Sequence, residues 1–307
     1  MLGEIVAETE AAKKLRDVSI AVHIGAPHTD NGQLTWSLRK DVKALSALGV
    51  MIRRPGTYKK DVVRLLEKQA KEYVTDEERE RLLARIITKQ KVSRLIVTDP
   101  NFLGVPAWML NGGRIYQNAG RNTGELRELF RQNRCELFLG IRNPATFVPA
   151  VFQSQTLKTW EEFTGGADLL NLRWSQVVKD ILAGNPDCPI TVWCNEDTPL
   201  IWPKILKKVA GIRSTFRFAG EHDILRKVMS EQGVQRLENY LAERPELTEA
   251  QRVQVQSLFL KYFHSEEAVE EEIDLPGWSQ HFVDDMTDVY LDDIAILERM
   301  PEITFIS

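Results

Sequence analysis

The chain has few cysteines and no long apolar run, which argues against a disulfide-rich protein and against a membrane-spanning one. Only three cysteines occur in 307 residues and none forms a CxxC pair, which favours free thiols in a reducing cytosol over a disulfide framework. No apolar stretch approaches the ~20 residues of a membrane helix. The first eight residues are acidic and lack an apolar core segment, so we expect no secretory signal and a cytoplasmic protein.

Several chemical signatures are also missing. The five histidines lack the spacing of a helical zinc motif, so we expect no metal, and His23, within an apolar run, is interpreted as a core histidine. No GxGxxG follows the first predicted strand, and GxxxxGK[ST] and GxSxG are absent. Forty basic against 44 acidic residues give a net charge of -4, which argues against nucleic-acid binding.

The remaining sequence has the composition of a folded α/β protein. Hydrophobic residues make up 43% and charged residues 27%, and a chain of this length buries about three quarters of its unfolded surface without help from disulfides or metals. Short apolar runs that end at polar loops alternate with helical patterns and predict strands. The predicted strands cover residues 18–24, 50–52, 93–98, 135–141, 190–194 and 303–306.

This alternation predicts one domain over residues 1–307, an α/β fold with a mostly parallel central sheet flanked by helices. We expect an N-terminal helix at 1–16 and a mainly helical C-terminal cover at 221–300. Apolar residues spaced by three or four predict one helix over 33–48. Asn111-Gly112-Gly113 predicts a hairpin turn.

The loop that precedes the helix at 33–48 has properties of an anion site. It lies at the carboxyl end of the first strand, where parallel α/β proteins bind ligands, and the helix offers backbone N–H groups and a positive dipole end. Gly25 and Gly32 permit a close approach of the backbone to a ligand. Thr29 can donate a hydroxyl, and a protonated His28 would add charge.

Asp30 supports a second interpretation of the same loop. A carboxylate near the first turn can cap the helix itself, and it then competes with a phosphate for the same N–H donors. The loop also lacks the lysine that phosphate loops carry. On the residues alone, we favour self-capping by Asp30 over anion binding.

Arg142 follows the predicted strand at 135–141 and has two equally good explanations. Its guanidinium can fork onto a phosphate or carboxylate of a ligand, or it can form an ion pair with Glu196 or Asp197. Because parallel strands end at one edge of a sheet, we expect the loop at 25–32, Arg142 and these two carboxylates to converge on one cleft.

Glu196 and Asp197 follow the strand at 190–194 and admit two roles. A carboxylate at a strand end can act as a general base. We favour the simpler role, in which Asp197 or Thr198 is the N-cap of the next helix and Pro199 occupies its first turn.

In their order and spacing, these junctions resemble bacterial sulfotransferase-like proteins over about residues 18–306. His23-Ile24-Gly25-Ala26-Pro27-His28-Thr29 resembles the family's opening, in which a strand leads into a loop that holds the inner phosphate of phosphoadenosine phosphosulfate. Ile141-Arg142-Asn143-Pro144 resembles the second signature, whose arginine holds the outer phosphate. The stretch from Val192 to Asp197 and the ending with Tyr290 and Asp293 also look like later parts of these sequences.

The resemblance implies a P-loop-like α/β fold and a reaction. The reaction is transfer of a sulfuryl group from phosphoadenosine phosphosulfate to a hydroxyl or amine of a small-molecule acceptor. His28 and Asp99 are the implied catalytic residues, and Asp30, Glu196 and Asp197 are further residues of the cleft. The implied nucleotide-binding residues are Gly25, His28, Thr29, Gly32, Gln33 and Arg142.

Several positions depart from the family's pattern. His28 replaces the loop lysine, Asp30 replaces a glycine, Ala150 replaces a phosphate-binding serine, and Asp99 is displaced by one residue from a glutamate. Because sulfuryl transfer needs a base and positive groups around the leaving phosphate, we expect weak or no nucleotide binding. The alternatives are a catalytically degenerate relative that binds another small molecule or a protein, and an enzyme of different chemistry that uses Asp30, Asp99 or Glu196.

Overall fold

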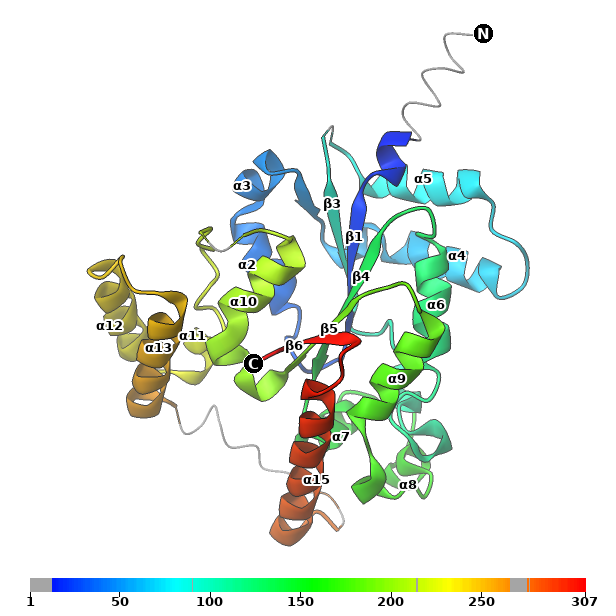
Figure 1. Ribbon diagram of the computed structural model, residues 1–307. Helices are drawn as coiled ribbons and strands as arrows, with labels where there is room; N and C mark the ends of the chain where they lie inside the picture. The colour runs from blue at the N-terminus through cyan, green and yellow to red at the C-terminus, as the bar shows by residue number, and fades with distance from the viewer. Residues whose placement is uncertain (1–12, 90, 214, 266–274, 276) are drawn as a thin grey trace.

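The fold is built on a six-stranded sheet in which every pair of neighbouring strands is parallel. The computed structural model describes residues 13–89, 91–213, 215–265, 275 and 277–307. The strand order is β2-β3-β1-β4-β5-β6, which confirms the predicted α/β fold with a parallel central sheet (Figure 1). The strands are β1 (Ser19–Gly25), β2 (Val50–Ile52), β3 (Arg94–Thr98), β4 (Cys135–Ile141), β5 (Ile190–Cys194) and β6 (Ile303–Ile306).

The strands form because their sequences are apolar on both faces. Helices cover both sides of a parallel sheet, so its strands are near-continuous hydrophobic runs. In β1, Ile20, Val22 and Ile24 pack into one core while Ala21 packs into the other. Figure 1 shows α2, α3 and α10 on one side of the sheet and α4, α5, α6 and α9 on the other.

The helices on the first side are α2 (Gln33–Lys40), α3 (Val42–Ala47) and α10 (Thr198–Ala210). The other helices before residue 190 are α4 (Lys59–Gln69), α5 (Asp76–Ile86), α6 (Ala119–Glu128), α7 (Pro144–Gln153), α8 (Trp160–Thr164) and α9 (Trp174–Gly184).

Two local predictions are wrong. The single helix expected over 33–48 is broken at Asp41, whose backbone leaves the helical region and whose carboxylate accepts the Ala219 N–H at 2.8 Å. The expected hairpin at Asn111 is instead a short 3-10 turn over Asn111–Gly113, because no strands flank it for a hairpin to join.

The C-terminal part is mainly helical, as expected, among its described residues. Helices α11 (Leu225–Val228), α12 (Glu231–Ala242) and α13 (Glu249–Phe263) share a small core of their own, and α15 (Gln280–Glu298) leads into β6. Of the N-terminal helix expected at 1–16, residues 13–16 are helical and residues 1–12 lie outside the described residues. Residues 266–274 and 276 of the expected cover also lie outside them.

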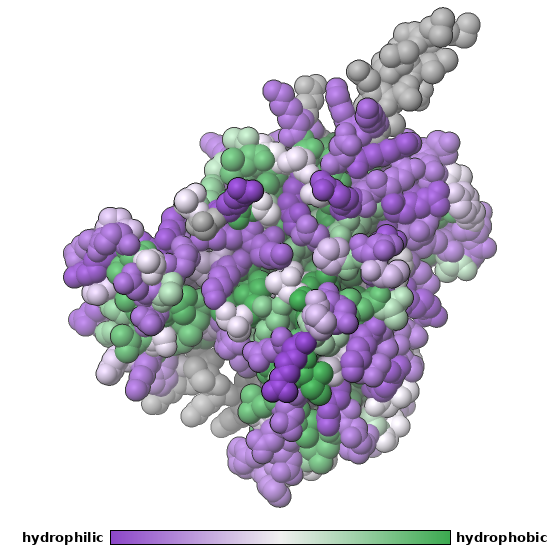
Figure 2. All heavy atoms as spheres, viewed as in Figure 1, coloured by the Kyte–Doolittle hydropathy of each residue, from purple (hydrophilic) through white to green (hydrophobic). Residues whose placement is uncertain are grey.

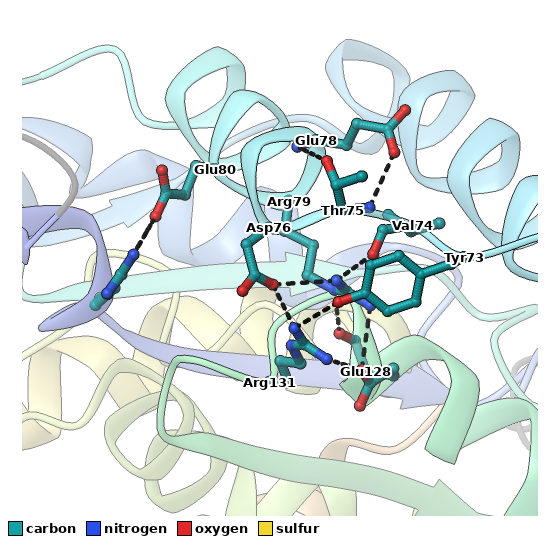
Figure 3. A network of polar contacts seen from close by, with 10 residues as sticks. Tyr73, Val74, Thr75, Asp76, Glu78, Arg79, Glu80, Glu128 and Arg131 are labelled. Atoms are coloured by element: carbon teal, nitrogen blue, oxygen red, sulfur yellow. Dashed lines mark hydrogen bonds and ion pairs between the residues drawn. The ribbon is translucent and has the colours of Figure 1, made fainter. Parts of the chain in front are cut away.

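A polar network around Arg79 joins α5 to α6 on the second side of the sheet (Figure 3). The Arg79 side chain is buried, and its guanidinium donates to the backbone carbonyls of Val74 and Glu128 and to the carboxylates of Asp76 and Glu128. Arg131, more exposed, donates to Asp76 at 2.6 Å and to Tyr73 at 2.9 Å. The network satisfies a buried charge with acceptors from two helices.

Helices α6 and α9 approach so closely that Gly120 has no room for a side chain. A Cβ on Gly120 would lie 2.1 Å from the Asp180 carbonyl oxygen, whereas a Cβ on Gly124 would lie 3.0 Å from that of Gly184. We expect Gly120→Ala to lower the free energy of unfolding by about 2 kcal/mol because the backbones must separate. Gly124→Ala should change it much less, since a helix-propensity gain of up to about 1 kcal/mol offsets the tighter contact. Urea unfolding compares the two, and equal losses would contradict this account of the packing.

Candidate functional site

A cleft of about 710 Å³ opens at the carboxyl ends of β1, β4 and β5. Its walls include His28, Thr29 and Asp30 from the loop after β1, Arg142 after β4, and Glu196 after β5. These five residues from the three strand ends therefore share one cleft, as expected, whereas Asp197 is not among the described residues that line it. A cavity of this size accommodates a small organic molecule.

The Asp30 carboxylate caps α2, as favoured from the sequence. Its Oδ1 accepts the Gly32 N–H at 3.2 Å, and its Oδ2 accepts the Leu34 N–H at 2.8 Å. The side chain is 8% exposed. The N–H groups that a phosphate would use at this helix start are thus occupied by the protein's own carboxylate.

The rest of the loop is held by internal hydrogen bonds. The buried Thr29 hydroxyl donates to the Ala26 carbonyl at 2.7 Å. His28 and Asn31 have φ values of 60° and 50°, a region in which residues other than glycine are uncommon. The loop is consequently fixed by its own contacts in a conformation that places His28 and Asn31 in the cleft wall.

Arg142, at the end of β4, holds this loop in place through a hydrogen bond to its backbone. Its Nε donates to the Thr146 hydroxyl at 2.9 Å, and its Nη1 donates to the His28 carbonyl at 3.1 Å. The side chain is buried at the cleft. The guanidinium therefore positions the loop and also lines the cavity.

Glu196 is held by donors from two other elements. Its Oε1 accepts the Asn143 N–H at 2.8 Å, and its Oε2 accepts the Tyr290 hydroxyl at 3.0 Å. Burial and the neighbouring Glu196 carboxylate raise the pKa of Tyr290 well above its ordinary value, so this phenol remains a donor. Glu196 links α7 to α15 at the cleft wall.

The expected side-chain cap at Asp197 or Thr198 is not formed. The Thr198 hydroxyl donates backwards to the Asn195 carbonyl at 2.6 Å, and Asp197 occupies the cap position without a side-chain cap hydrogen bond. The physical reason is that a 3-10 turn over Asn195–Asp197 runs directly into α10, so Asp197 already has helical dihedral angles. Pro199 lies in the first turn as predicted.

Asp99, an expected catalytic residue, is engaged away from the cleft. Its carboxylate pairs with Lys59 at 2.8 Å and accepts the Asn101 N–H at 3.0 Å. It is 3% exposed, and it is not among the described residues that line the cleft. The geometry gives it a structural role at the end of β3.

Three expected nucleotide-binding residues also lie outside the cleft lining, as far as the described residues go. Gly25 has a φ of 117°, and a Cβ there would lie 2.6 Å from the Pro100 carbonyl oxygen, so backbone packing accounts for this glycine. Gly32 also has a positive φ, of 80°, with open space around it. The Gln33 amide donates to Ser37 and Asp223, both at 3.2 Å.

His23 is a core residue, as interpreted from the sequence. Its ring stacks on Trp193 with centroids 5.7 Å apart, and its Nδ1 lies 3.0 Å from the Thr98 hydroxyl. Burial lowers the pKa of His23, partly offset by the Asp30 carboxylate. This histidine is therefore neutral at physiological pH.

The second wall of the cleft comes from the C-terminal cover, which the sequence did not connect with the site. The basic residues of this wall are Lys227, Lys261 and His264, and its apolar residues are Ile224, Val228 and Leu260. They come from α11 and α13 and their flanks, far along the chain from the loop after β1. Only the tertiary packing of α11 and α13 brings them there.

Within the described residues, no group of three or more His, Cys, Asp and Glu side chains is arranged to hold a metal ion. None of the helices in the described part of the chain combines the length and apolar character needed to cross a membrane. Comparison of the sequence with known protein families and with curated proteins finds no match.

Proposed function

We propose that this protein is a binding module on a sulfotransferase-like frame, which takes a small molecule into the cleft and does not transfer a sulfuryl group. The proposal rests chiefly on the Asp30 carboxylate, which accepts the N–H groups of Gly32 and Leu34. A phosphate at this loop would have to displace that carboxylate and would also be repelled by it.

Three further residues support the same conclusion. Phosphoadenosine phosphosulfate, which the sequence resemblance implies, needs cations and hydroxyls around its phosphates. His28 replaces the charged lysine of that pattern, and Ala150 supplies no hydroxyl. Asp99, the implied base, is paired with Lys59 away from the cleft. The residues present therefore do not fit this nucleotide.

Sulfuryl transfer is the second candidate, and one observation favours it. His28, Thr29 and Arg142, all implied to hold the nucleotide, line one cleft large enough for a ligand. If the loop could release Asp30 on binding, these three residues would surround a phosphate. The two candidates differ directly in whether the wild-type protein binds the nucleotide.

Thermal unfolding with phosphoadenosine phosphate separates them. A ligand at a hundred times its Kd stabilises a protein by about 2.7 kcal/mol, which gives a clear rise in Tm. We expect no rise for the wild-type protein at millimolar nucleotide, with adenosine as the uncharged control. A rise with the nucleotide but not with adenosine would contradict the proposal and favour sulfuryl transfer.

A further inference from the structure

The charges in the cleft are unevenly distributed between its two walls. The carboxylates, Asp30 and Glu196, lie on the sheet side, and each is already satisfied by two internal donors. The cover contributes two lysines, Lys227 and Lys261, to the lining. Among the described residues, neither lysine has an ion-pair partner. The donors to Asp30 and Glu196 are neutral groups, so both carboxylates keep their negative charge. On the cover side of the cleft, by contrast, Lys227 and Lys261 supply positive charge.

Backbone contacts join the two segments of the cover that carry these lysines. The end of α11 and the end of α13 are joined by a Ser230 N–H to Phe263 carbonyl bond of 2.8 Å and a Ser265 N–H to Val228 carbonyl bond of 2.9 Å. Met229 and His264 pair between these two bonds. The two segments that carry Lys227 and Lys261 are therefore fixed to each other by backbone hydrogen bonds.

A buried polar cluster fixes the cover against the sheet. Asp223, just before α11, accepts from the Ser37 hydroxyl at 2.7 Å and from the Gln33 amide at 3.2 Å, and it pairs with Lys40. These partners all belong to α2, the helix that directly follows the cleft loop. The lysine-bearing wall is thus tied to the loop-bearing wall.

The same wall has an apolar surface beside its lysines. Ile224, Val228 and Leu260 contribute to the cleft lining, as does Pro199 at the start of α10. Figure 2 shows apolar side chains among polar ones on the lobe that α12 and α13 form. A ligand in the cleft therefore meets an apolar strip with cations at its side.

From this arrangement we infer that the ligand of the cleft is an amphipathic organic anion, with its acidic group held by Lys227 and Lys261 and its apolar body against Ile224, Val228 and Leu260. The ligand class rests on the proposed function, because it assumes that the cleft is a binding site. In this inference the cover recognises the ligand, and the loop after β1, whose amides Asp30 occupies, forms only part of the cleft wall.

Titration calorimetry with octyl sulfate as the probe tests the ligand class. We expect binding at one site, and no comparable binding of octyl glucoside, which has the same chain and an uncharged head. Across hexyl, octyl and decyl sulfates, each added methylene should strengthen binding by up to about fourfold, the value for a fully buried CH₂. Equal affinity for the charged and neutral probes would overturn the inference.

Lysine variants locate the site. Lys227→Ala with Lys261→Ala should weaken octyl sulfate binding by about tenfold, the effect of losing charge-assisted hydrogen bonds. The matched control is Lys43→Ala with Lys60→Ala, which removes two exposed lysines that do not line the cleft. Equal loss in both double variants, or none in the first, would overturn the assignment to the cover. All variants touch exposed side chains, and their Tm values should equal that of the wild type.

Parallel titrations with phosphoadenosine phosphate keep the two proposals distinguishable. Nucleotide binding by the wild type would contradict the proposed function, whatever the lysine variants do to octyl sulfate. If the wild-type protein bound neither the nucleotide nor octyl sulfate, the result would agree with the proposed function and would contradict only the inferred ligand class.

Discussion

His28→Lys combined with Asp30→Gly is expected to give the loop measurable affinity for phosphoadenosine phosphate, about a hundredfold above the wild type. Removing Asp30 frees the N–H groups of Gly32 and Leu34 and removes a repelling charge. Lysine adds a full positive charge at neutral pH, where histidine side chains are titrating. Each change is worth about tenfold, the effect of one or two charge-assisted hydrogen bonds. Titration calorimetry on the wild type, the two single variants and the double variant measures the gain.

Asp30→Asn is the matched control for the capping role. An amide oxygen still accepts a helix N–H, so this variant should keep most of the stability that Asp30→Gly loses, about 1 kcal/mol for a lost cap. It should also remain a poor nucleotide binder, since the donors stay occupied. Equal, negligible affinity in every variant would show that the loop cannot hold this nucleotide even when its amides are free.

Arg79→Met is expected to lower the free energy of unfolding by about 3 kcal/mol, because it removes a buried guanidinium with two hydrogen bonds to backbone carbonyls, and a hydrogen bond to a charged group contributes about 1.5 kcal/mol or more. The substitution leaves the Val74 and Glu128 carbonyls without their donor and loosens the junction of α5 and α6. Methionine keeps the length and apolar stem of the side chain, so the loss reports the polar contacts. Denaturant unfolding measures it.

Arg131→Met is the control, since it removes a neighbouring guanidinium of the same network that is about one third exposed. Exposed ion pairs contribute about 1 kcal/mol or less. If Arg131→Met were as damaging as Arg79→Met, the stabilisation would come from the net charge of the cluster and not from the buried arginine.

The sheet could be predicted because the apolar pattern of each strand is contained within a few neighbouring residues. Runs such as Val18 to Ile24 are apolar at five of their seven positions, as expected of a strand that is covered on both faces. The cleft edge followed from the direction of parallel strands. Self-capping by Asp30 was predictable because the carboxylate and the amides it binds lie within four residues.

The residues that sequence reasoning misplaced depend on distant partners. Asp99 pairs with Lys59 of α4, and Gln33 donates to Asp223, which lies 190 residues further along the chain. No local pattern encodes such choices. Lys227 and Lys261 were missed for the same reason, since a lysine on a polar helix face has no feature that marks it as part of a cleft.

Nitrogen-15-resolved amide spectra of the wild-type protein with added phosphoadenosine phosphate test the central claim most directly. The Gly32 and Leu34 amides are the donors that Asp30 occupies, so their resonances report whether a phosphate replaces the carboxylate. We predict that neither resonance moves in the wild type and that both move in the variant with His28→Lys and Asp30→Gly. Saturable shifts of both amides in the wild type would contradict the account.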